Sequence, residues 1–254
     1  MLLNCDMGES YGAWRMGDDA AVMPYIDMAS IACGFHAGEP AIMQATVRLA
    51  RDHQVAIGAH PSYPDLAGFG RRSMQFPADT LAAIVHYQIG ALAAICRAND
   101  TELAYVKPHG ALYNDMQANA GLFLTVLEVV ARCNEPLQQP LALLTLAQTG
   151  AVAEQQSELA EKYGVKLLRE AFADRRYDPN GQLRSRHHHD AVLHDRQQIL
   201  TQVQQFAAGQ PIVASDGSAL TIHADTLCVH GDNAESVATV AAIRALLGER
   251  SSNL

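Results

Sequence analysis

Titratable side chains recur directly after short apolar runs of this sequence, and most lie beside glycine or proline. The segments that carry them contain Asn4, Asp6 and Glu9, then His36, His60, Lys107 and His109, then Glu170, Asp174 and Arg175, and finally His230 and Asp232. Carboxylates and imidazoles move protons in general acid–base catalysis, and both bind divalent metals. Glycine lets the backbone approach a ligand closely, and proline fixes how a loop leaves a strand. These residue types at these positions indicate a site for catalysis or binding.

The elements that must position these side chains alternate along the chain. Residues 2–5, 29–33, 55–58, 103–106, 141–145, 165–168 and 226–229 are apolar runs that we predict as strands. Apolar residues at helical spacing predict a helix that begins at Pro40 and another from Pro77 to Ile95. The same spacing predicts helices over 120–132, 191–208 and 234–247. Alternating strands and helices are typical of βαβ units with a parallel sheet. We predict an α/β fold with a single β/α barrel of about seven parallel strands over residues 1–254; an open doubly wound sheet is the alternative.

In parallel β/α folds, functional side chains gather where strands end and the following loops begin. Asp6 ends an apolar run, where a carboxylate must be paired, hydrogen-bonded or metal-bound. Its alternative role is to fix a loop. His36, His60 and His109 are candidates for metal ligands, for general acids or bases, or for polar groups satisfied by the backbone. Parallel strands would bring all four side chains into one pocket.

The basic residues have two interpretations each. Lys107 precedes Pro108 at a strand end, so it either points into the barrel and binds an anion or lies on the surface. Arg71 and Arg72 follow Gly70 and could bind a carboxylate or phosphate through paired N–H groups, or form a surface pair. The run His187-His188-His189 lies in a polar loop, and we expect it to be solvated.

Composition excludes several classes of partner. The net charge of −9 makes the chain a poor candidate for binding nucleic acid or an anionic membrane. Its five cysteines include no CxxC pair, which favours a reducing compartment. The N-terminus lacks the pattern of a signal peptide, so we expect a cytoplasmic protein.

No Gly-Lys dipeptide occurs, which excludes a Walker-type phosphate loop. The alanine-rich stretch 80–98 could pack against another copy of the chain.

The segments at the strand ends resemble the LamB/YcsF family, which is the family of the 5-oxoprolinase A subunits. They read LNCDMGESYG (3–12), SIACGFHAGEP (30–40), IGAHPSYPDLAGFGRR (57–72), VKPHGALYN (106–114), EAFADRRY (170–177) and CVHGD (228–232). These segments follow the family's order and span nearly the whole chain. Ser62, where glycine is common in the family, and the histidine run are small departures from its pattern.

This resemblance implies ATP-dependent hydrolysis of 5-oxoproline (pyroglutamate) to L-glutamate, together with the partner subunits B and C of a 5-oxoprolinase. It implies a barrel related to those of glycoside hydrolases and polysaccharide deacetylases. In the resulting hypothesis, Asp6 or His60 is the general base, and Lys107 and His109 stabilise negative charge. Either Arg72 or Arg175 would bind the substrate carboxylate. The other candidates for substrate binding are Asn4, Glu9, His36, Glu170, Asp174, His230 and Asp232.

Two other functions fit the same residues. A metal-dependent deacetylase acting on a carbohydrate or amide could bind a divalent ion through Asp6, His36 and His60. A non-catalytic protein could instead present substrate to its partners, although a small lactam needs few ionisable contacts. With no phosphate loop visible, we expect ATP to be a co-substrate handled with the partner subunits.

Overall fold

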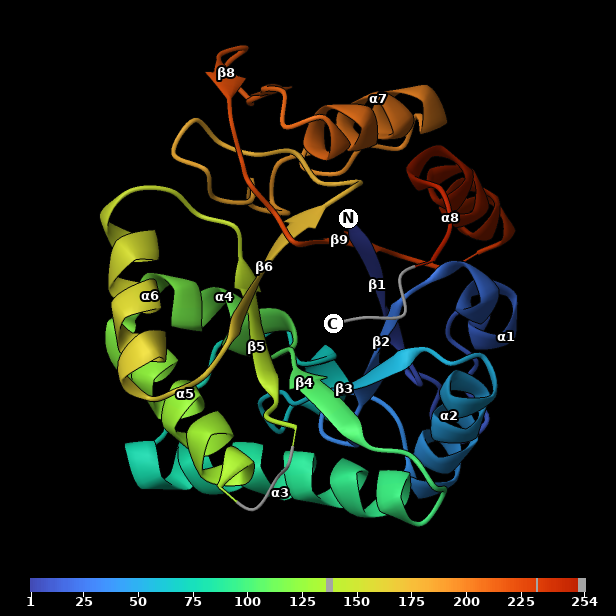
Figure 1. Cartoon of the computed structure of the whole chain (residues 1–254), viewed down its shortest axis with the longest axis vertical. Coiled ribbons are helices and arrows are strands. Elements are labelled where there is room, and N and C mark those ends of the chain that lie inside the picture. The colour runs from blue at the N-terminus through green and yellow to red at the C-terminus, as the bar shows by residue number, and fades with distance from the viewer. Residues whose placement is uncertain (136–138, 232, 251–254) are drawn as a thin grey trace.

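Seven parallel strands form the centre of the molecule in a computed structural model that describes residues 1–135, 139–231 and 233–250 (Figure 1). They are β1 (Leu2–Met7), β2 (Met28–Ala32), β3 (Ala56–His60), β4 (Leu103–Val106), β5 (Ala142–Leu146), β6 (Leu167–Phe172) and β9 (Thr226–Val229). Strand β9 pairs with both β6 and β1, which closes the sheet into a barrel. The predicted α/β barrel is therefore confirmed, and the open doubly wound sheet is wrong. The relationship to glycoside hydrolase and deacetylase barrels and the single domain over 1–254 stay predictions.

Helices surround the barrel (Figure 1). They are α1 (Asp19–Val22), α2 (Pro40–Asp52), α3 (Ala78–Arg97), α4 (Gly110–Ala118), α5 (Ala120–Asn134), α6 (Ala151–Lys162), α7 (Arg196–Ala207) and α8 (Ala234–Leu247). Short 3-10 turns lie at Met23–Tyr25 and Leu66–Gly68, and a hairpin joins β7 (Ile212–Val213) to β8 (Ala219–Leu220). Helices α4 and α6 lie where the sequence patterns predicted none.

The helix predicted over 191–208 begins later than expected. Asp195 caps α7 by accepting the N–H of Gln198, so the helix starts at Arg196. The preceding residues are extended, and Val192 forms a bridge with Arg175. Ala191 and Leu193 are buried in that loop, and their apolar character mimicked one more helical turn.

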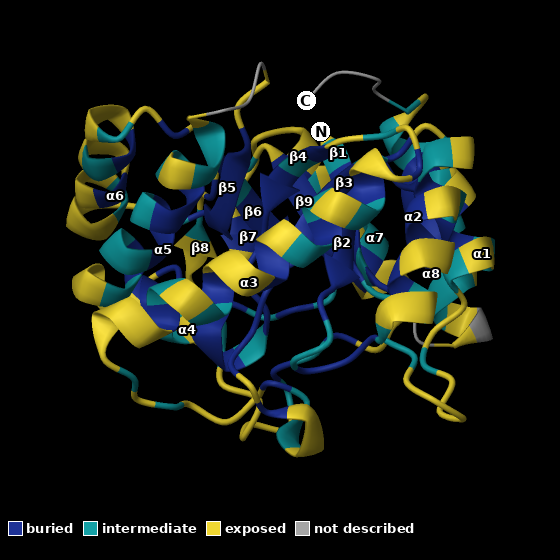
Figure 2. Cartoon of the chain, turned by 90° about the horizontal axis from the view of Figure 1, so that it is seen from below, coloured by how far each residue is buried: buried dark blue, intermediate teal, exposed yellow. Residues whose placement is uncertain are grey.

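Two apolar cores lie on the two faces of the barrel. The larger one fills the space between strands and helices, while Met28, Tyr105, Leu144 and Leu168 pack in a separate cluster with Ala142. Figure 2 shows the strands buried and the outer faces of the helices exposed. Gly58 provides the space for Tyr105, because a Cβ at this position would lie 2.1 Å from the ring. The tyrosine then reaches Ser30, with its hydroxyl 3.0 Å from Ser30 Oγ.

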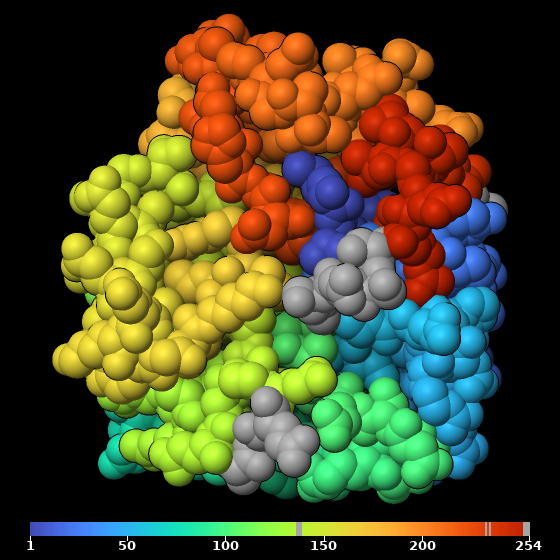
Figure 3. Space-filling view, in the orientation of Figure 1, coloured from blue at the N-terminus to red at the C-terminus, as the bar shows by residue number. Residues whose placement is uncertain are grey.

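The two ends of the described chain meet along one seam of the barrel. Asn4 lies opposite Cys228 in the β1–β9 pairing, and its Nδ2 donates to Thr226 Oγ1 at 3.0 Å. Figure 3 shows the blue N-terminal segment beside the orange and red C-terminal segments. The first and last strands of the barrel are thus joined by their backbone pairing and by a hydrogen bond between buried side chains.

Helix α3 is the one helix in the described residues that is long and apolar enough to cross a membrane by length and composition. It packs against α2, α5, β3 and β4. Its buried side chains include Leu81, Val85, Ile89 and Leu92, which share one face at helical spacing. This packing identifies α3 as a helix of the barrel's outer layer.

Candidate active site

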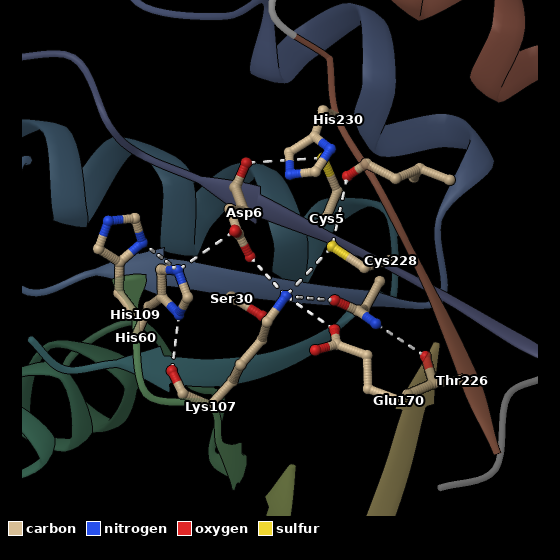
Figure 4. A network of polar contacts seen from close by, with 12 residues as sticks. Cys5, Asp6, Ser30, His60, Lys107, His109, Glu170, Thr226, Cys228 and His230 are labelled. Atoms are coloured by element: carbon tan, nitrogen blue, oxygen red, sulfur yellow. Dashed lines mark hydrogen bonds and ion pairs between the residues drawn. The ribbon is translucent and has the colours of Figure 1, made fainter. Parts of the chain in front are cut away.

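Lys107 is the centre of a charged layer inside the barrel (Figure 4). It follows β4, and its Nζ lies 2.9 Å from Asp6 Oδ1, 2.8 Å from Glu170 Oε1 and 2.9 Å from Asn4 Oδ1. The ammonium donates hydrogen bonds to Asn4, to Asp6 and to Cys228 Sγ, and it forms an ion pair with Glu170. Burial disfavours the charged lysine, but Asp6, Cys228 and Glu170 raise its pKa well above the ordinary value. Lys107 is therefore a permanent cation that holds protein carboxylates, rather than the open anion site considered from the sequence.

Asn4 has the same kind of role beneath the cavity. It is fully buried, and its side chain joins Lys107 to Thr226 on β9. Because this side chain faces protein groups on both sides, the structure gives Asn4 the position of a support for Lys107. The predicted contact between Asn4 and substrate has no geometric support.

Asp6, His60 and His109 form a connected row beside Lys107 (Figure 4). His60 Nε2 lies 3.3 Å from Asp6 Oδ2 and 3.0 Å from His109 Nδ1. Burial opposes the ionisation of Asp6, but His60 and Lys107 hold its pKa well below the usual range. Asp6 is therefore a carboxylate at neutral pH. Burial and His60 lower the pKa of His109 to about 3, which makes this imidazole neutral.

A loop after β3 completes the surroundings of these histidines. His36 stacks on His109 with ring centroids 3.8 Å apart, and the Phe69 ring packs edge-on against both. Phe69 has a left-handed backbone (φ 54°), and its carbonyl accepts a hydrogen bond from His109 Nε2 at 2.9 Å. Gly70 follows with φ 64°, and a Cβ there would lie 2.8 Å from both His36 and His109. Strained backbone and glycine together bring this loop onto the imidazoles.

His230 and Asp174 form a second pair at the same edge of the barrel. Nδ1 of His230 lies 2.9 Å from Asp174 Oδ2, and both side chains are about one-fifth exposed, at 23% and 22%. Burial opposes the charge of Asp174, yet His230 holds its pKa below the ordinary value. A carboxylate that receives Nδ1–H leaves Nε2 of the imidazole as a proton acceptor. This pair is suited to move a proton at the cavity.

A cavity of about 1000 Å³ opens above the charged layer. Asp6, Glu9, His60, Lys107, His109 and His230 contribute to its lining, with Phe69, Tyr113 and Phe172 among the aromatic walls. The arginines that line it are Arg15, Arg71, Arg175, Arg184 and Arg186. Of these, Arg184 is paired with Asp178 and Asp190. The other arginines give the cavity a cationic wall although the whole chain carries a net charge of −9.

Several predicted site residues lie elsewhere. Arg72 points away from the cavity, since its largely exposed guanidinium is bound to the buried carboxylate of Asp65, and its neighbour Arg71 lines the cavity instead. Arg175 lies at the cavity but also donates to the backbone carbonyls of Ala191 and Arg184. Asp232 lies outside the described residues. The run 187–189 is exposed, as predicted.

The proposed metal ligands regroup in space. One donor atom each from Glu9, His36, His60 and His109 lies within 4.8 Å of the others. Asp6 was expected to complete a set with His36 and His60. It contacts His60 and Lys107 instead, and Glu9 and His109 take its place in the cluster.

Three further residues lie at or near the site, and the sequence patterns assigned none of them a functional role. Tyr113 lines the cavity, and burial together with Glu170 raises its pKa well above the ordinary value. Cys228, expected only as a small buried side chain, also lies with its Sγ 3.3 Å from Lys107 Nζ. Ser10 lies in a Gly8–Gly12 segment with G-x-S-x-G spacing, but its hydroxyl is bound to the backbone of Met16. Ser10 therefore fixes the loop.

Comparison with known proteins agrees along the entire chain. Residues 1–254 match the LamB/YcsF family. The 5-oxoprolinase A subunit of Pseudomonas fluorescens (strain Pf0-1) is 55% identical over 251 residues, covering 99% of this chain and 98% of that protein. The 5-oxoprolinase A subunit of Vibrio cholerae (strain M66-2) is 51% identical over 247 residues and covers 97% of both chains.

A solved structure has the same fold. The lactam utilization protein from Thermus thermophilus superposes with a TM-score of 0.87 at 37% identity, covering 97% of this chain and 95% of that one. The family match, the relatives and this barrel all extend over nearly the full length. The chain belongs to the LamB/YcsF family.

Proposed function

We propose that this chain is the A subunit of an ATP-dependent 5-oxoprolinase, which opens 5-oxoproline to L-glutamate together with other subunits. The relatives of that name align with it from end to end. The observation that carries the proposal is the buried Asp6–Lys107–Glu170 layer beneath the cavity, flanked by imidazoles. Such a site suits a hydrolysis in which protons must be exchanged at a carbonyl carbon and at an amide nitrogen.

The substrate explains the need for ATP. A γ-lactam is an unstrained amide with a poor leaving group, so its hydrolysis is slow without activation. The overall reaction consumes 5-oxoproline, ATP and two water molecules and yields glutamate, ADP and phosphate. Transfer of the γ-phosphoryl group to the lactam oxygen would make the ring carbon electrophilic. Water could then add to this carbon, and cleavage of the C–N bond with protonation of the nitrogen would give γ-glutamyl phosphate. The second water molecule would hydrolyse this acyl phosphate to glutamate and phosphate.

Division of the reaction between subunits follows from the sequence and the cavity. The sequence has no Walker-type loop, so we assign phosphoryl transfer to the partner subunits B and C. The cavity of about 1000 Å³ is at the upper end of the usual range for small-molecule sites. Its arginines suit a ligand that carries phosphate as well as carboxylate. We therefore assign this chain the binding and ring opening of the activated lactam.

Roles within the site follow the geometry. Asp6 is an ionised carboxylate in the lining of the cavity and is our candidate for the base that accepts a proton from water. The His230–Asp174 pair is our candidate for protonating the leaving nitrogen. Lys107 positions Asp6 and Glu170. Arg71 joins Arg175 as a candidate for the substrate carboxylate, in place of Arg72.

The test is ATP-dependent release of glutamate by the purified chain alone and after mixing with candidate B and C subunits. We expect activity only in the mixture and a loss of about 10²–10⁴-fold for Asp6→Asn. Asp52→Asn, an exposed aspartate paired with Arg51, is the matched control and should retain full activity. ATP hydrolysis by the chain alone, or wild-type turnover by Asp6→Asn, would contradict the proposal. Binding without turnover of an activated lactam would support the substrate-presenting alternative.

Location and self-association are proposals of the same kind. We propose a cytoplasmic protein, because all five cysteines are free thiols, which a reducing compartment preserves. Packing of the exposed face of α3 on a second copy stays a proposal as well. Size-exclusion chromatography of the chain, with and without its partners, tests this association.

A further inference from the structure

We propose that Glu9, His36, His60 and His109 form a binding site for one divalent transition-metal ion of the zinc type. The four side chains come from the loops and strand ends after β1, β2, β3 and β4. One donor atom from each lies within 4.8 Å of the others. The site is argued from these contacts alone and does not depend on the proposed hydrolysis.

Hydrogen bonds fix the orientation of two imidazoles. His60 Nδ1 lies 2.6 Å from the Lys107 carbonyl oxygen, and His109 Nε2 lies 2.9 Å from the Phe69 carbonyl oxygen. A carbonyl oxygen only accepts, so both of these nitrogens carry hydrogen. The ring nitrogens left to act as lone-pair donors to a metal ion are therefore His60 Nε2 and His109 Nδ1. They face each other at 3.0 Å, a distance at which either one proton or one metal ion must lie between or beside the two nitrogens.

His36 adds a third lone pair without a hydrogen bond. It is 1% exposed, and neither of its ring nitrogens has a hydrogen-bond partner among the residues that the structure describes. Buried polar atoms are normally hydrogen-bonded, so an imidazole in this state indicates a missing ligand. His36 Nε2 lies 3.4 Å from Glu9 Oε1, which in turn lies 3.9 Å from His109 Nδ1. The carboxylate thus supplies charge to the same small volume.

Three of the six donor–donor separations lie near the edge lengths of a tetrahedral site. Ligand distances of about 2.0–2.2 Å for zinc give ligand–ligand edges of about 3.3–3.6 Å. The edges here are 3.0 Å between His60 and His109, 3.4 Å between His36 and Glu9, and 3.9 Å between His109 and Glu9. His36 lies parallel to His109, so its ring must tilt for both nitrogens to point at one ion.

Donor chemistry selects the class of metal. Imidazole nitrogens suit zinc, cobalt, nickel and copper, whereas magnesium and calcium prefer oxygen ligands. Histidines that bind metals also donate their second ring N–H to a carbonyl or carboxylate. His60 and His109 do so toward Lys107 and Phe69. When bound, such an ion would supply Lewis acidity next to Asp6, whose Oδ2 lies 3.3 Å from His60 Nε2.

The experiment measures metal directly on the full chain without an affinity tag. The exposed His187, His188 and His189 could bind metal weakly, so the background protein carries His187→Ala, His188→Ala and His189→Ala. After treatment with chelator, this protein is titrated with ZnCl₂ by calorimetry, and the bound metal is counted after dialysis. We expect one zinc per chain, no binding of MgCl₂, and visible absorption typical of tetrahedral cobalt when CoCl₂ replaces zinc.

Variants identify the ligands. In the background protein, His36→Ala and His109→Ala should each weaken zinc binding by more than about 100-fold. That is more than the loss expected when a residue that only supports a metal ligand is replaced. Glu9→Gln keeps the shape of a partly exposed side chain and guards against misfolding. Zinc should raise the melting temperature of the background protein and raise that of Glu9→Gln less, because only the native state holds the ion. His223→Ala, at an exposed histidine preceding β9, is the matched control and should bind zinc normally.

Two results would overturn the site. One is a background protein that binds less than half an equivalent of zinc. The other is unchanged zinc affinity in folded His36→Ala and His109→Ala. Neither result depends on turnover, so zinc binding without 5-oxoprolinase activity would sustain the metal site while contradicting the proposed function.

Discussion

At the scale of single residues, the buried charge of Lys107 determines how the site is held together. Its ammonium lies between Asp6 and Glu170 and forms an ion pair with each. Without the ammonium, both carboxylates would lose this ion pair inside the barrel. A buried charge that loses its partner is costly, whereas an exposed one is not. We therefore expect the main roles of Lys107 to be stabilising the fold and positioning Asp6 and Glu170.

Replacement of Lys107 tests this interpretation. Lys107→Met should lower the free energy of unfolding by about 3–5 kcal/mol, because it leaves Asp6 and Glu170 unpaired inside the barrel. Urea unfolding at pH 7 measures the difference. Lys166→Met, at an exposed lysine, should change stability by less than about 0.5 kcal/mol. Equal stabilities of the two variants would contradict the assigned role.

At the scale of elements, the loop between β3 and α3 is held by its own internal contacts and packs on the imidazoles of the site. Its residues 61–72 pack on His36 and His109 through Phe69 and Gly70. Asp65 holds the loop by accepting the backbone N–H of Gly68 and the guanidinium of Arg72. Arg72 thus acts on the site through the loop, which explains why its position in the motif suggested a ligand contact.

A side chain at position 70 should disturb the site. Gly70→Ala combines a positive φ with a Cβ that would lie 2.8 Å from His36 and His109. Gly209→Ala has nearly the same φ of 63° and nothing within 4 Å, so it isolates the backbone strain. We expect Gly70→Ala to be less stable than Gly209→Ala by about 1–3 kcal/mol in urea unfolding. Similar losses in both variants would mean that the loop does not press on the imidazoles.

The Asp65–Arg72 contact predicts a pH dependence of stability. The hydrogen bond from Arg72 holds the pKa of Asp65 below its ordinary value, so the folded state binds this proton less readily than the unfolded one. Its stabilisation is complete above the unfolded pKa of about 3.9 and is lost as pH falls through the lower folded value. The difference in unfolding free energy between wild type and Asp65→Asn should be largest at pH 7 and shrink below about pH 4. A difference that stays constant as the pH falls to about 3 would argue against this contact.

At the scale of the whole molecule, closure of the barrel joins the two ends of the chain at the site. Strand β9 contributes Cys228 to Lys107, and Thr226 to Asn4 on β1. It also pairs with β6, where Thr226 lies opposite Glu170, so one strand adjoins Lys107, Asn4 and Glu170. The cationic cavity wall is a property of the same scale, since it gathers arginines from loops far apart in an acidic chain.

Removal of β9 should therefore prevent folding. A chain that ends at residue 225 leaves the edges of β1 and β6 unpaired and removes α8 from the outer layer. In thermal unfolding followed by circular dichroism, we expect a cooperative transition for the full chain and none for the shortened chain. A cooperative transition with native-like near-ultraviolet signal in the shortened chain would show that closure is dispensable.

How much could be predicted depends on the range of the interactions. Each of the seven predicted strands overlaps an observed strand, because buried strands need local apolar runs such as 226–229. The bounds differ most for the run 165–168, which shares only two residues with β6 (Leu167–Phe172). The start of α7 could not be predicted, because the burial of Ala191 and Leu193 comes from contacts with a distant strand end rather than from helical spacing. Helix α4 begins at Gly110, whose left-handed backbone gives no helical signal in sequence.

The sequence by itself determined the class of site, because glycine, proline and titratable residues at strand ends depend on local chain geometry. It placed Asp6, His60, His109 and His230 at one edge of a barrel, and they are there. Only the tertiary structure decided which groups touch. Pairing of Lys107 with carboxylates, the choice of Arg71 over Arg72, and the meeting of Glu9 with three imidazoles depend on the closure of the barrel and the course of its loops. Contacts between segments a hundred residues apart have no local signature, so they become visible only when the chain is folded.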